Sequence, residues 1–446
     1  MKKIIFILMS FVFTTALFSQ EQRFSMQEAI DFALKNNRMA KNAIRDIEAA
    51  EKQKWETTST GLPQISASID YNNWLKQQVS LIPAEFFGGN PGEFAEVAFG
   101  TEQSMNATAR INQKIFDGSY LVGLQSAKVF LEISNNAKEK TDLEVRKSVI
   151  NAYGNVLLAE ESVNILEKNI AVLQKNLDET TKIYENGLGE EESVEQLQIT
   201  LSGVQSSLNN TKRLQKLAHQ MFNITIGTDI DAETVLTEFL DGLTSQNIVI
   251  SLLEADENIE NTVDYRIAAN DKRSKELLLK LEKSKALPTI NAFLNGSYAG
   301  YSDQFTFAKK NQRWFGSSLF GMSMDIPIFS SLGRTAATQR AQINLEKSEE
   351  LLTETEQNLK LQIASAKSNY KYAIEDYQNK QNNLRLAERI EQKNQTKFFE
   401  GIATSFELRQ AQTQLYTTQQ EFLTAMLDVI NQKAELETVL NQIPKN

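Results

Sequence analysis

The stretch PQISASIDYNNW, residues 63–74, decides the fold, because apolar and polar side chains alternate along it. A period of two predicts a β-strand with two unlike faces. One face carries Ile65, Ala67, Ile69 and Tyr71, and the other carries Gln64, Ser66, Ser68, Asp70 and Asn72. At about a dozen residues, the segment is slightly longer than the roughly 9–11 residues that a tilted transmembrane strand needs.

Three further segments alternate in the same way, at residues 104–116, 288–301 and 317–329. On this pattern alone, two hairpins packed on a soluble core remain an alternative to a membrane sheet. The polar faces carry charges that suit a water-filled barrel lumen better than a dry core, namely Asp70, Arg110, Lys114 and Asp325. Aromatic residues that fit the girdle of a membrane barrel occupy the loop-side strand ends, namely Trp74, Tyr301 and Trp314.

Between these strands the sequence predicts very long helices. Residues 118–185 contain no proline, and apolar side chains recur there at every seventh position from Val149 to Tyr184. Residues 334–399 and 404–440 hold similar heptads, which are typical of coiled-coil packing. At 1.5 Å per residue, the first of these helices is on the order of 100 Å long. Shorter helices are expected at residues 25–57, 193–222 and 264–287.

The chain contains an internal duplication. GLPQI at residues 61–65 is echoed by ALPTI at 286–290, and YENGL at 184–188 by FFEGI at 398–402. The repeated unit is a short helix, two membrane strands, a long helix and a returning helix. It predicts a first repeat at residues 21–224 and a second at 263–446, with a mixed segment at 225–262 between them.

The start of the chain and its composition restrict the possible locations. A basic start, an apolar run at residues 4–17 and small polar residues near position 20 predict a signal peptide over residues 1–20. The chain has no cysteine, which excludes disulfides and a cysteine-linked lipid anchor. Its net charge of −10, without a basic cluster, argues against binding to nucleic acid.

Chemistry and assembly can also be predicted from the residues. We find no paired carboxylates, nucleophile elbow, phosphate loop or metal-ligand spacing, and His219 stands alone, so no catalytic, cofactor or metal residue is predicted. Beyond Leu17 no apolar run approaches the roughly 20 residues of a membrane helix, so a membrane role requires strands. Because about eight strands are the fewest that close a membrane barrel, four strands predict an obligate oligomer.

The order of elements, the duplication and several local motifs resemble the TolC-like outer-membrane efflux family across almost the whole mature chain. FSMQEAIDFALKNN at residues 24–37 is similar to that family's first helix, and Ser25 with Glu28 fits a capping box. The strand-to-helix joints at residues 116–118 and 329–331 are similar too.

The resemblance implies a mainly α-helical fold with a transmembrane β-barrel portion. A homotrimer would form a twelve-stranded barrel in the outer-membrane lipid and a tunnel of twelve helical columns in the periplasm. It further implies a passive exit duct, which receives substrates from an inner-membrane pump through a periplasmic adaptor, or membrane fusion protein. The cargo and the type of pump stay open.

The resemblance also implies roles for particular residues. The tip of the tunnel that meets the adaptor would include Tyr184, Gly187, Leu188, Phe398, Gly401 and Ile402. Glu195 and Glu407 would form a periplasmic gate of carboxylates. Helix caps are an alternative explanation, since glycine suits a helix C-terminus and both glutamates are expected in the first turn of a returning helix. The first tip turn is longer and more acidic than the second.

A second function, from another class, is a periplasmic coiled-coil adaptor or structural spacer without a pore. Adaptors usually carry one helical hairpin between mirrored β-domain halves. This sequence instead has two strand-and-helix units in tandem, and its strands alternate as membrane strands do. The comparison therefore favours the duct.

Overall fold

The computed structural model of the protein describes residues 22–255 and 258–442. The predicted signal peptide at residues 1–20 lies outside this part of the chain. The described residues divide into two compact units, the first of residues 22–47, 133–255, 258–269 and 351–442 and the second of Glu48–Glu132 and Asn270–Glu350. Each unit therefore contains parts of both sequence repeats.

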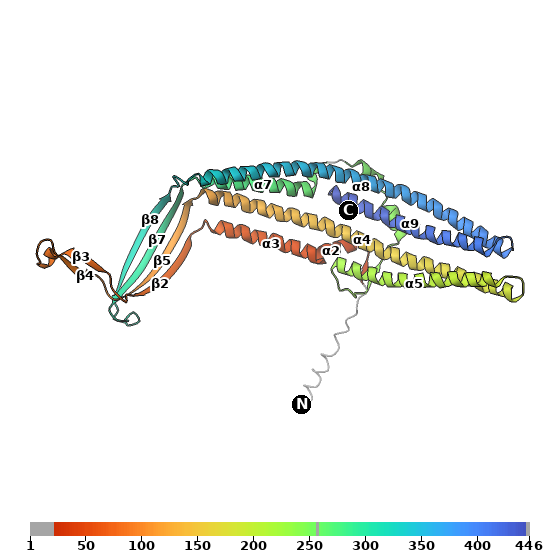
Figure 1. The fold of residues 1–446 in the computed structure, drawn as a ribbon, viewed down its shortest axis with the longest axis horizontal. Coiled ribbons are helices and arrows are strands. Elements are labelled where there is room, and N and C mark those ends of the chain that lie inside the picture. The colour runs from red at the N-terminus through yellow and green to blue at the C-terminus, as the bar shows by residue number, and fades with distance from the viewer. Residues whose placement is uncertain (1–21, 256–257, 443–446) are drawn as a thin grey trace, which may run out of the picture. The chain divides into compact units, whose positions relative to one another are not determined.

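The second unit is built on a four-stranded antiparallel sheet with the strand order β2-β5-β7-β8 (Figure 1). The strands are β2 (Gln64–Asn73), β5 (Gln103–Phe116), β7 (Thr289–Ser302) and β8 (Trp314–Asp325). All four were predicted, but β8 lies a few residues earlier than expected and ends at Asp325. Pro327 follows, which has no backbone N–H for a ladder hydrogen bond.

The register of this sheet separates the two kinds of side chain. Ile65 pairs with Ile111, Ile111 with Leu294, and Leu294 with Phe320, so one face is apolar across all four strands. On the opposite face, Arg110 pairs with Ser66 and with Asn295. The alternation that predicted two unlike faces is thus preserved by the pairing.

Two glycines allow close packing where strands meet helices in this unit. A Cβ on Gly61 would lie 2.2 Å from the ring of Tyr120, whose hydroxyl donates to the carbonyl of Thr58 at 3.1 Å. A Cβ on Gly118, the first residue of α4, would lie 2.8 Å from Leu287. Asp117 accepts the Ser119 N–H at 2.9 Å and so caps that helix.

A β-hairpin that the sequence analysis missed occupies the connection between β2 and β5. It consists of β3 (Val79–Pro83), the 3₁₀ turn η1 (Ala84–Phe87) and β4 (Phe94–Ala98). Both faces of this hairpin are largely apolar, so it shows no clear alternation of apolar and polar residues. For that reason its periodicity did not mark it as strand.

The first unit is mainly helical. The long helices α4 (Gly118–Glu185) and α8 (Gly333–Phe399) extend into it, and each is followed by a returning helix, α5 (Glu191–Ile226) or α9 (Ser405–Val439). Its core gathers Val149, Tyr153, Val156, Phe222, Ile226, Tyr370, Val429 and Ile430. Tyr153 packs edge-on against Phe222 at 5.9 Å and donates its hydroxyl to the carbonyl of Phe24 at 3.1 Å. Burial raises the pKa of the Tyr153 hydroxyl.

The first predicted helix is in fact two helices, α2 (Met26–Asn36) and α3 (Arg38–Ser59). Asn37 separates them, donating its side-chain amide to the carbonyl of Thr225 at 2.7 Å and accepting the Met39 N–H at 2.7 Å. An asparagine that satisfies backbone groups outside its own helix offers the chain a place to break. The third short helix, α7, covers Val263–Ser284.

The segment between the repeats is held to the long helices by half-buried polar contacts, two of them to the buried Tyr370. It contains β6 (Thr234–Leu236), which pairs in parallel with β1 (Gln22–Phe24), followed by α6 (Leu240–Gln246), η2 (Ile250–Glu254) and η3 (Ile259–Asn261). The Tyr370 hydroxyl donates to the Asn247 carbonyl at 2.6 Å and accepts the Val249 N–H at 2.8 Å. Lys433 donates to the Asn247 side chain at 3.0 Å.

The Tyr370→Phe variant should loosen this segment. It leaves the Val249 N–H and the Asn247 carbonyl without their partner, which costs about 1–3 kcal/mol for a buried group. Hydrogen exchange followed by mass spectrometry should therefore show amides 247–254 exchanging about tenfold faster or more. Tyr372→Phe is the matched control, since Tyr372 is 66 % exposed. Equal exchange in both variants would contradict the role given to Tyr370.

Candidate functional site

Each long helix of the first unit ends in the same kind of turn. Gly187 and Gly401 have φ values of +72° and +74°, in the left-handed region that favours glycine. The Gly187 N–H donates to the Tyr184 carbonyl at 2.8 Å and the Leu188 N–H to the Ile183 carbonyl at 3.0 Å. This hydrogen-bond pair is a Schellman motif, which ends the helix and satisfies its last carbonyls.

The second turn repeats this geometry. The Gly401 N–H donates to the Phe398 carbonyl at 3.0 Å, and the Ile402 N–H donates to the Lys397 carbonyl at 2.8 Å. A Cβ on either glycine would meet nothing within 4 Å, so the backbone angle alone calls for glycine there. The C-cap explanation of both glycines is confirmed.

Apolar side chains next to both glycines are exposed to solvent. Leu188 is 82 % exposed and Ile402 is 71 % exposed, while Tyr184 is exposed and Phe398 packs on Phe399 at 5.4 Å. Each turn therefore presents a large aliphatic side chain directly after its glycine. The six predicted tip residues thus form two equivalent sets of three, one at each turn.

The two turns differ in how the next helix begins. Thr404 caps α9 in a capping box, in which the Thr404 N–H donates to Glu407 at 2.8 Å and the Glu407 N–H donates to the Thr404 hydroxyl at 3.3 Å. At α5 the N-cap is Glu190, whose side chain makes no capping hydrogen bond. Two more glutamates, Glu191 and Glu192, occupy the first turn of α5.

The two predicted gate residues consequently occupy different helical positions. Glu407 lies in the first turn of α9, as expected, and is held there by Thr404. Glu195 does not lie in the first turn, because α5 begins at Glu191, two residues earlier than predicted. Both side chains are exposed. The prediction that both glutamates lie in the first turn of a returning helix is therefore confirmed for Glu407 and wrong for Glu195.

The α4/α5 pair of this unit meets the α8/α9 pair through a polar seam that the sequence analysis missed. Ser162, Asn169 and Asn176 recur at one heptad position of α4, and all three are buried. Asn169 donates to Gln419 at 2.9 Å, and Gln395 donates to Asn176 at 2.9 Å. Between α4 and α5, by contrast, Leu173, Leu197, Leu201 and Val204 form an apolar cluster. Polar side chains at such core positions fix the register of packed helices.

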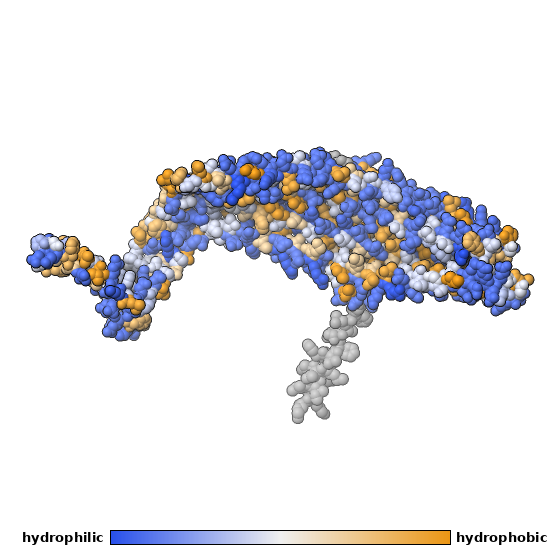
Figure 2. Space-filling view, in the orientation of Figure 1, coloured by the Kyte–Doolittle hydropathy of each residue, from blue (hydrophilic) through white to orange (hydrophobic). Residues whose placement is uncertain are grey.

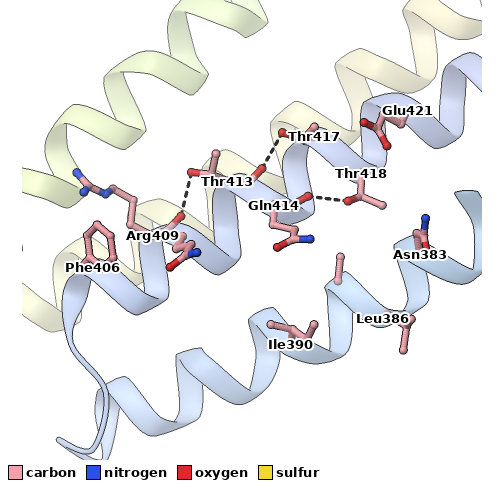
Figure 3. A pocket seen from close by; sticks show the side chains of 12 residues that line it. Asn383, Leu386, Ile390, Phe406, Arg409, Thr413, Gln414, Thr417, Thr418 and Glu421 are labelled. Atoms are coloured by element: carbon pink, nitrogen blue, oxygen red, sulfur yellow. Dashed lines mark hydrogen bonds between the residues drawn. The ribbon is translucent and has the colours of Figure 1, made fainter.

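A groove of about 790 Å³ runs between α8 and α9 close to the second turn (Figure 3). Ile390 and Leu386 line it from α8, and Phe406 and Thr413 from α9. The threonines on its α9 side donate their hydroxyls back to their own helix, as Thr413 does to the Arg409 carbonyl at 2.9 Å. The groove is nevertheless lined by polar and apolar groups in similar measure, because Arg409, Gln414 and Glu421 also line it.

In the second unit, the predicted lumen residues lie on the polar face of the sheet. Asp70 pairs with Asn106, and Asp325 pairs with Thr289. Arg110 donates to Asn112 at 2.8 Å and lies 5.0 Å from the ring of Phe293. Lys114 forms an ion pair with Asp117 at 3.1 Å. The four charges share one face but do not form a single cluster.

The predicted aromatic girdle is only partly on the apolar face. Trp314 pairs with Gly300 and shares the face of Ile65, whereas Tyr301 pairs with Ser104 on the polar face and packs on Phe315 at 6.1 Å. Trp74 follows the last residue of β2, and its N–H donates to the Glu102 carbonyl at 2.8 Å. Tyr301 therefore does not share the face on which a lipid-facing girdle would lie.

A different aromatic cluster covers the apolar face near the same strand ends. Phe307 from the β7–β8 connection lies 5.9 Å from Tyr71 and 6.2 Å from Trp314, and Phe305 packs on both Tyr71 and Phe307. The alternation of Tyr71 identified it as apolar-facing, but nothing local predicted that the loop would fold over this face.

Within residues 22–255 and 258–442, no group of three or more His, Asp or Glu side chains could hold a metal ion. His219, the single histidine, lies 3.1 Å from Glu160. None of the helices in this described part is long and apolar enough to cross a membrane.

This architecture is that of outer-membrane channels. It resembles the crystal structure of CusC, a structure concerned with transmembrane channel formation, with a TM-score of 0.75, 17 % identity and coverage of 93 % of this chain and 92 % of that chain. The outer membrane protein VceC from Vibrio cholerae has a TM-score of 0.71 and 14 % identity, with coverage of 93 % of this chain and 95 % of that chain. The open-state MtrE outer membrane channel of Neisseria gonorrhoeae has a TM-score of 0.70 and 18 % identity, with coverage of 93 % of this chain and 88 % of that chain.

The sequence profile of the outer membrane efflux protein family matches residues 29–222 and 258–442. The chain belongs to this family, which confirms the predicted resemblance, the fold class and the location in the outer membrane with a periplasmic helical extension. No curated protein sequence matches the chain significantly.

The capping box makes the start of α9 sensitive to pH. The Thr404 N–H and hydroxyl that donate to Glu407 hold the pKa of this carboxyl below its ordinary value of 4.5. A depressed pKa contributes stability above the ordinary value, and this stability is lost as the pH falls through the lowered pKa. Amides 405–408 should therefore exchange faster than expected from intrinsic rates in mildly acidic buffer, below about pH 4.5.

The Glu407→Gln variant should remove this pH dependence, and Glu195→Gln should leave it unchanged because Glu195 lies on another helix. Hydrogen exchange at several pH values, corrected for intrinsic rates, provides the measurement. If Glu407→Gln kept the full pH dependence, the capping carboxylate would not be its source.

Proposed function

We propose that the protein is the outer-membrane exit duct of a tripartite efflux or secretion system. In this role it is a passive conduit without catalytic chemistry of its own. An inner-membrane pump would deliver substrates through a periplasmic adaptor. The observation that carries the proposal is the four-stranded sheet of the second unit, which has one apolar face in the open and two unpaired edges.

The apolar face of the sheet is unfavourable in water and requires contact with another apolar phase or surface. Ile65 and Ile69 on β2 are 75 % and 73 % exposed, and Phe320, Met322 and Met324 on β8 are exposed as well. Each Å² of apolar surface left in water costs about 25 cal/mol, so a face of this kind favours contact with lipid. The opposite, polar face suits a water-filled interior.

The two edges require further copies of the chain. In lipid, an unpaired backbone N–H or C=O costs several kcal/mol, so open sheet edges do not occur there. The edges here are β2 and β8, and joining β2 of one copy to β8 of the next would pair both of them. A homotrimer would close twelve strands into one barrel, a number large enough for an open lumen.

The two helix turns support contact with an adaptor. Leu188 and Ile402 expose aliphatic side chains directly after Gly187 and Gly401, and contact with a partner would remove both from water. In the proposed trimer, three copies of each turn would provide six apolar contacts for the adaptor. Glu195 and Glu407 would add rings of carboxylates near the same turns, as a periplasmic gate that favours cations.

A pair of neighbouring residues tests the membrane face. Ile69→Lys places a charge on the apolar face, which costs about 2–4 kcal/mol near the centre of the bilayer, whereas Ser68→Lys places it on the polar face. We expect Ile69→Lys to reduce strongly the amount of assembled protein in outer-membrane fractions that resist salt and carbonate extraction. Ser68→Lys should assemble like the unaltered protein. Equal assembly, or recovery of the unaltered protein in the soluble periplasm, would refute the duct and favour the pore-free spacer.

The gate is tested separately in planar lipid bilayers. Replacing Glu195 and Glu407 by Gln removes two carboxylates per chain while keeping the side-chain shape, so cation preference should fall. Glu161→Gln, at a half-buried site on α4 away from the turns, is the control and should leave the selectivity unaltered. Unchanged selectivity and conductance in the double variant would remove the gate and leave the duct standing.

A further inference from the structure

The β3–β4 hairpin presents more apolar surface than an isolated hairpin can keep in water. Figure 2 shows hydrophobic surface over this hairpin, and Phe86, its most exposed aromatic residue, is 80 % exposed. Leu81, Phe87, Phe94 and Phe99 are exposed as well. A two-stranded hairpin alone is at best marginally stable in water, so another surface must cover it.

The hairpin is acidic and the nearby β7–β8 connection is basic. Residues 75–102 carry Glu85, Glu93, Glu96 and Glu102 against a single Lys76, and residues 303–313 carry Lys309, Lys310 and Arg313 against a single Asp303. In the described part of the chain, none of these charged side chains forms an ion pair. Within one copy Glu93 accepts only the Asn90 amide at 3.5 Å, and Arg313 lies 4.9 Å from the ring of Phe315. The two exposed segments of opposite charge therefore have no ion-pair partners within the described residues of one copy.

Closing the wall brings these two segments together between copies. β2 ends at Asn73 and leads into the hairpin, whereas β8 begins at Trp314 directly after the basic connection. β2 and β8 are opposite edges of the sheet, and they would run antiparallel when β2 of one copy pairs with β8 of the next. The end of one strand and the start of the other then lie at the same rim of the wall.

We propose that the β3–β4 hairpin of one protomer docks on the 303–313 connection of the adjacent protomer. Glu93 and Glu96 of the hairpin pair with Lys309 and Lys310 of the second copy, and the apolar hairpin surface packs on the exposed Phe305. The contact repeats between all copies and forms a collar at the rim of the barrel. It rests on the oligomeric wall of the proposed duct, and it adds contacts outside the lipid that select the correct neighbour.

A lipid surface accounts for fewer of these observations. Anionic head groups would attract the basic connection, but they would repel a hairpin with four glutamates and one lysine. The first residue of the basic connection is also fixed within its own copy, because the Glu102 N–H donates to Asp303 at 3.1 Å. A second copy of the chain provides opposite charges for both the acidic hairpin and the basic connection.

A charge exchange tests the contact. The acidic-to-basic variant Glu93→Lys/Glu96→Lys and the basic-to-acidic variant Lys309→Glu/Lys310→Glu should each lower the temperature at which the detergent-solubilised oligomer dissociates. The combination of all four changes should restore most of the loss, because the two segments again carry opposite charges. Additive losses without recovery, or no shift in either variant, would overturn the proposal. Loss that follows only Lys309→Glu/Lys310→Glu and disappears without anionic lipid would assign the connection to lipid instead.

Covalent capture gives a second measurement, since the chain has no native cysteine. Oxidation of Glu96→Cys/Lys310→Cys should yield dimers and trimers in denaturing gels, whereas each single cysteine variant should yield none or far fewer. Monomer alone in the double variant would refute the contact. An unaltered protein that is monomeric in detergent would refute the duct, whereas a trimer without this cross-link would refute only the collar.

Discussion

Backbone hydrogen bonding at the two sheet edges is the constraint on which the rest of this structure depends. A strand in lipid has no water to satisfy its outer N–H and C=O groups, so β2 and β8 can exist there only if they are paired. The need for further copies is therefore a property of the single chain. The apolar face reinforces it, because a closed wall of the proposed kind would turn Ile65 and its neighbours toward lipid and the charged face toward water.

Within the helical unit, polar groups provide the specificity that long helices lack. A uniform apolar heptad would let two helices slide by one repeat with little loss, whereas buried asparagines penalise every register except one. The Asn169–Gln419 and Asn176–Gln395 hydrogen bonds supply such a penalty between α4 and the α8/α9 pair. Arg146, Lys433 and Glu437 do the same beside the inter-repeat segment, where both cations lie within 3.3 Å of one buried carboxylate. Removing one partner would leave a charge buried without compensation.

Periodic features were predictable from the sequence, and features that depend on distant partners were not. The alternation at residues 63–74 and the heptads of α4 each repeat many times, so local chemistry identified them. The break at Asn37 depends on a carbonyl 188 residues away, at Thr225. The face of Tyr301 depends on its register with Ser104, and the position of Glu195 depends on a helix start without a capping side chain. Aromatic or acidic character alone could not place these residues.

The two helix turns have the same backbone conformation, but the helices that follow them begin differently. Both turns keep glycine at a positive φ and the same pair of backbone hydrogen bonds, since any residue with a Cβ is strained there. A helix N-terminus can be stabilised in several ways, and the two repeats differ in this respect. α9 begins with a threonine–glutamate capping box, and α5 begins with a run of glutamates. Three or more carboxylates near the positive end of α5 are favoured by its dipole but repel one another. Assembly of several copies would raise that repulsion most at the first turn, because the capping carboxylate of the second turn is stabilised as an anion by two Thr404 donors. The two turns are therefore equivalent in backbone shape and unequal in electrostatics, so an asymmetric response at the tunnel tip can arise from a symmetric fold.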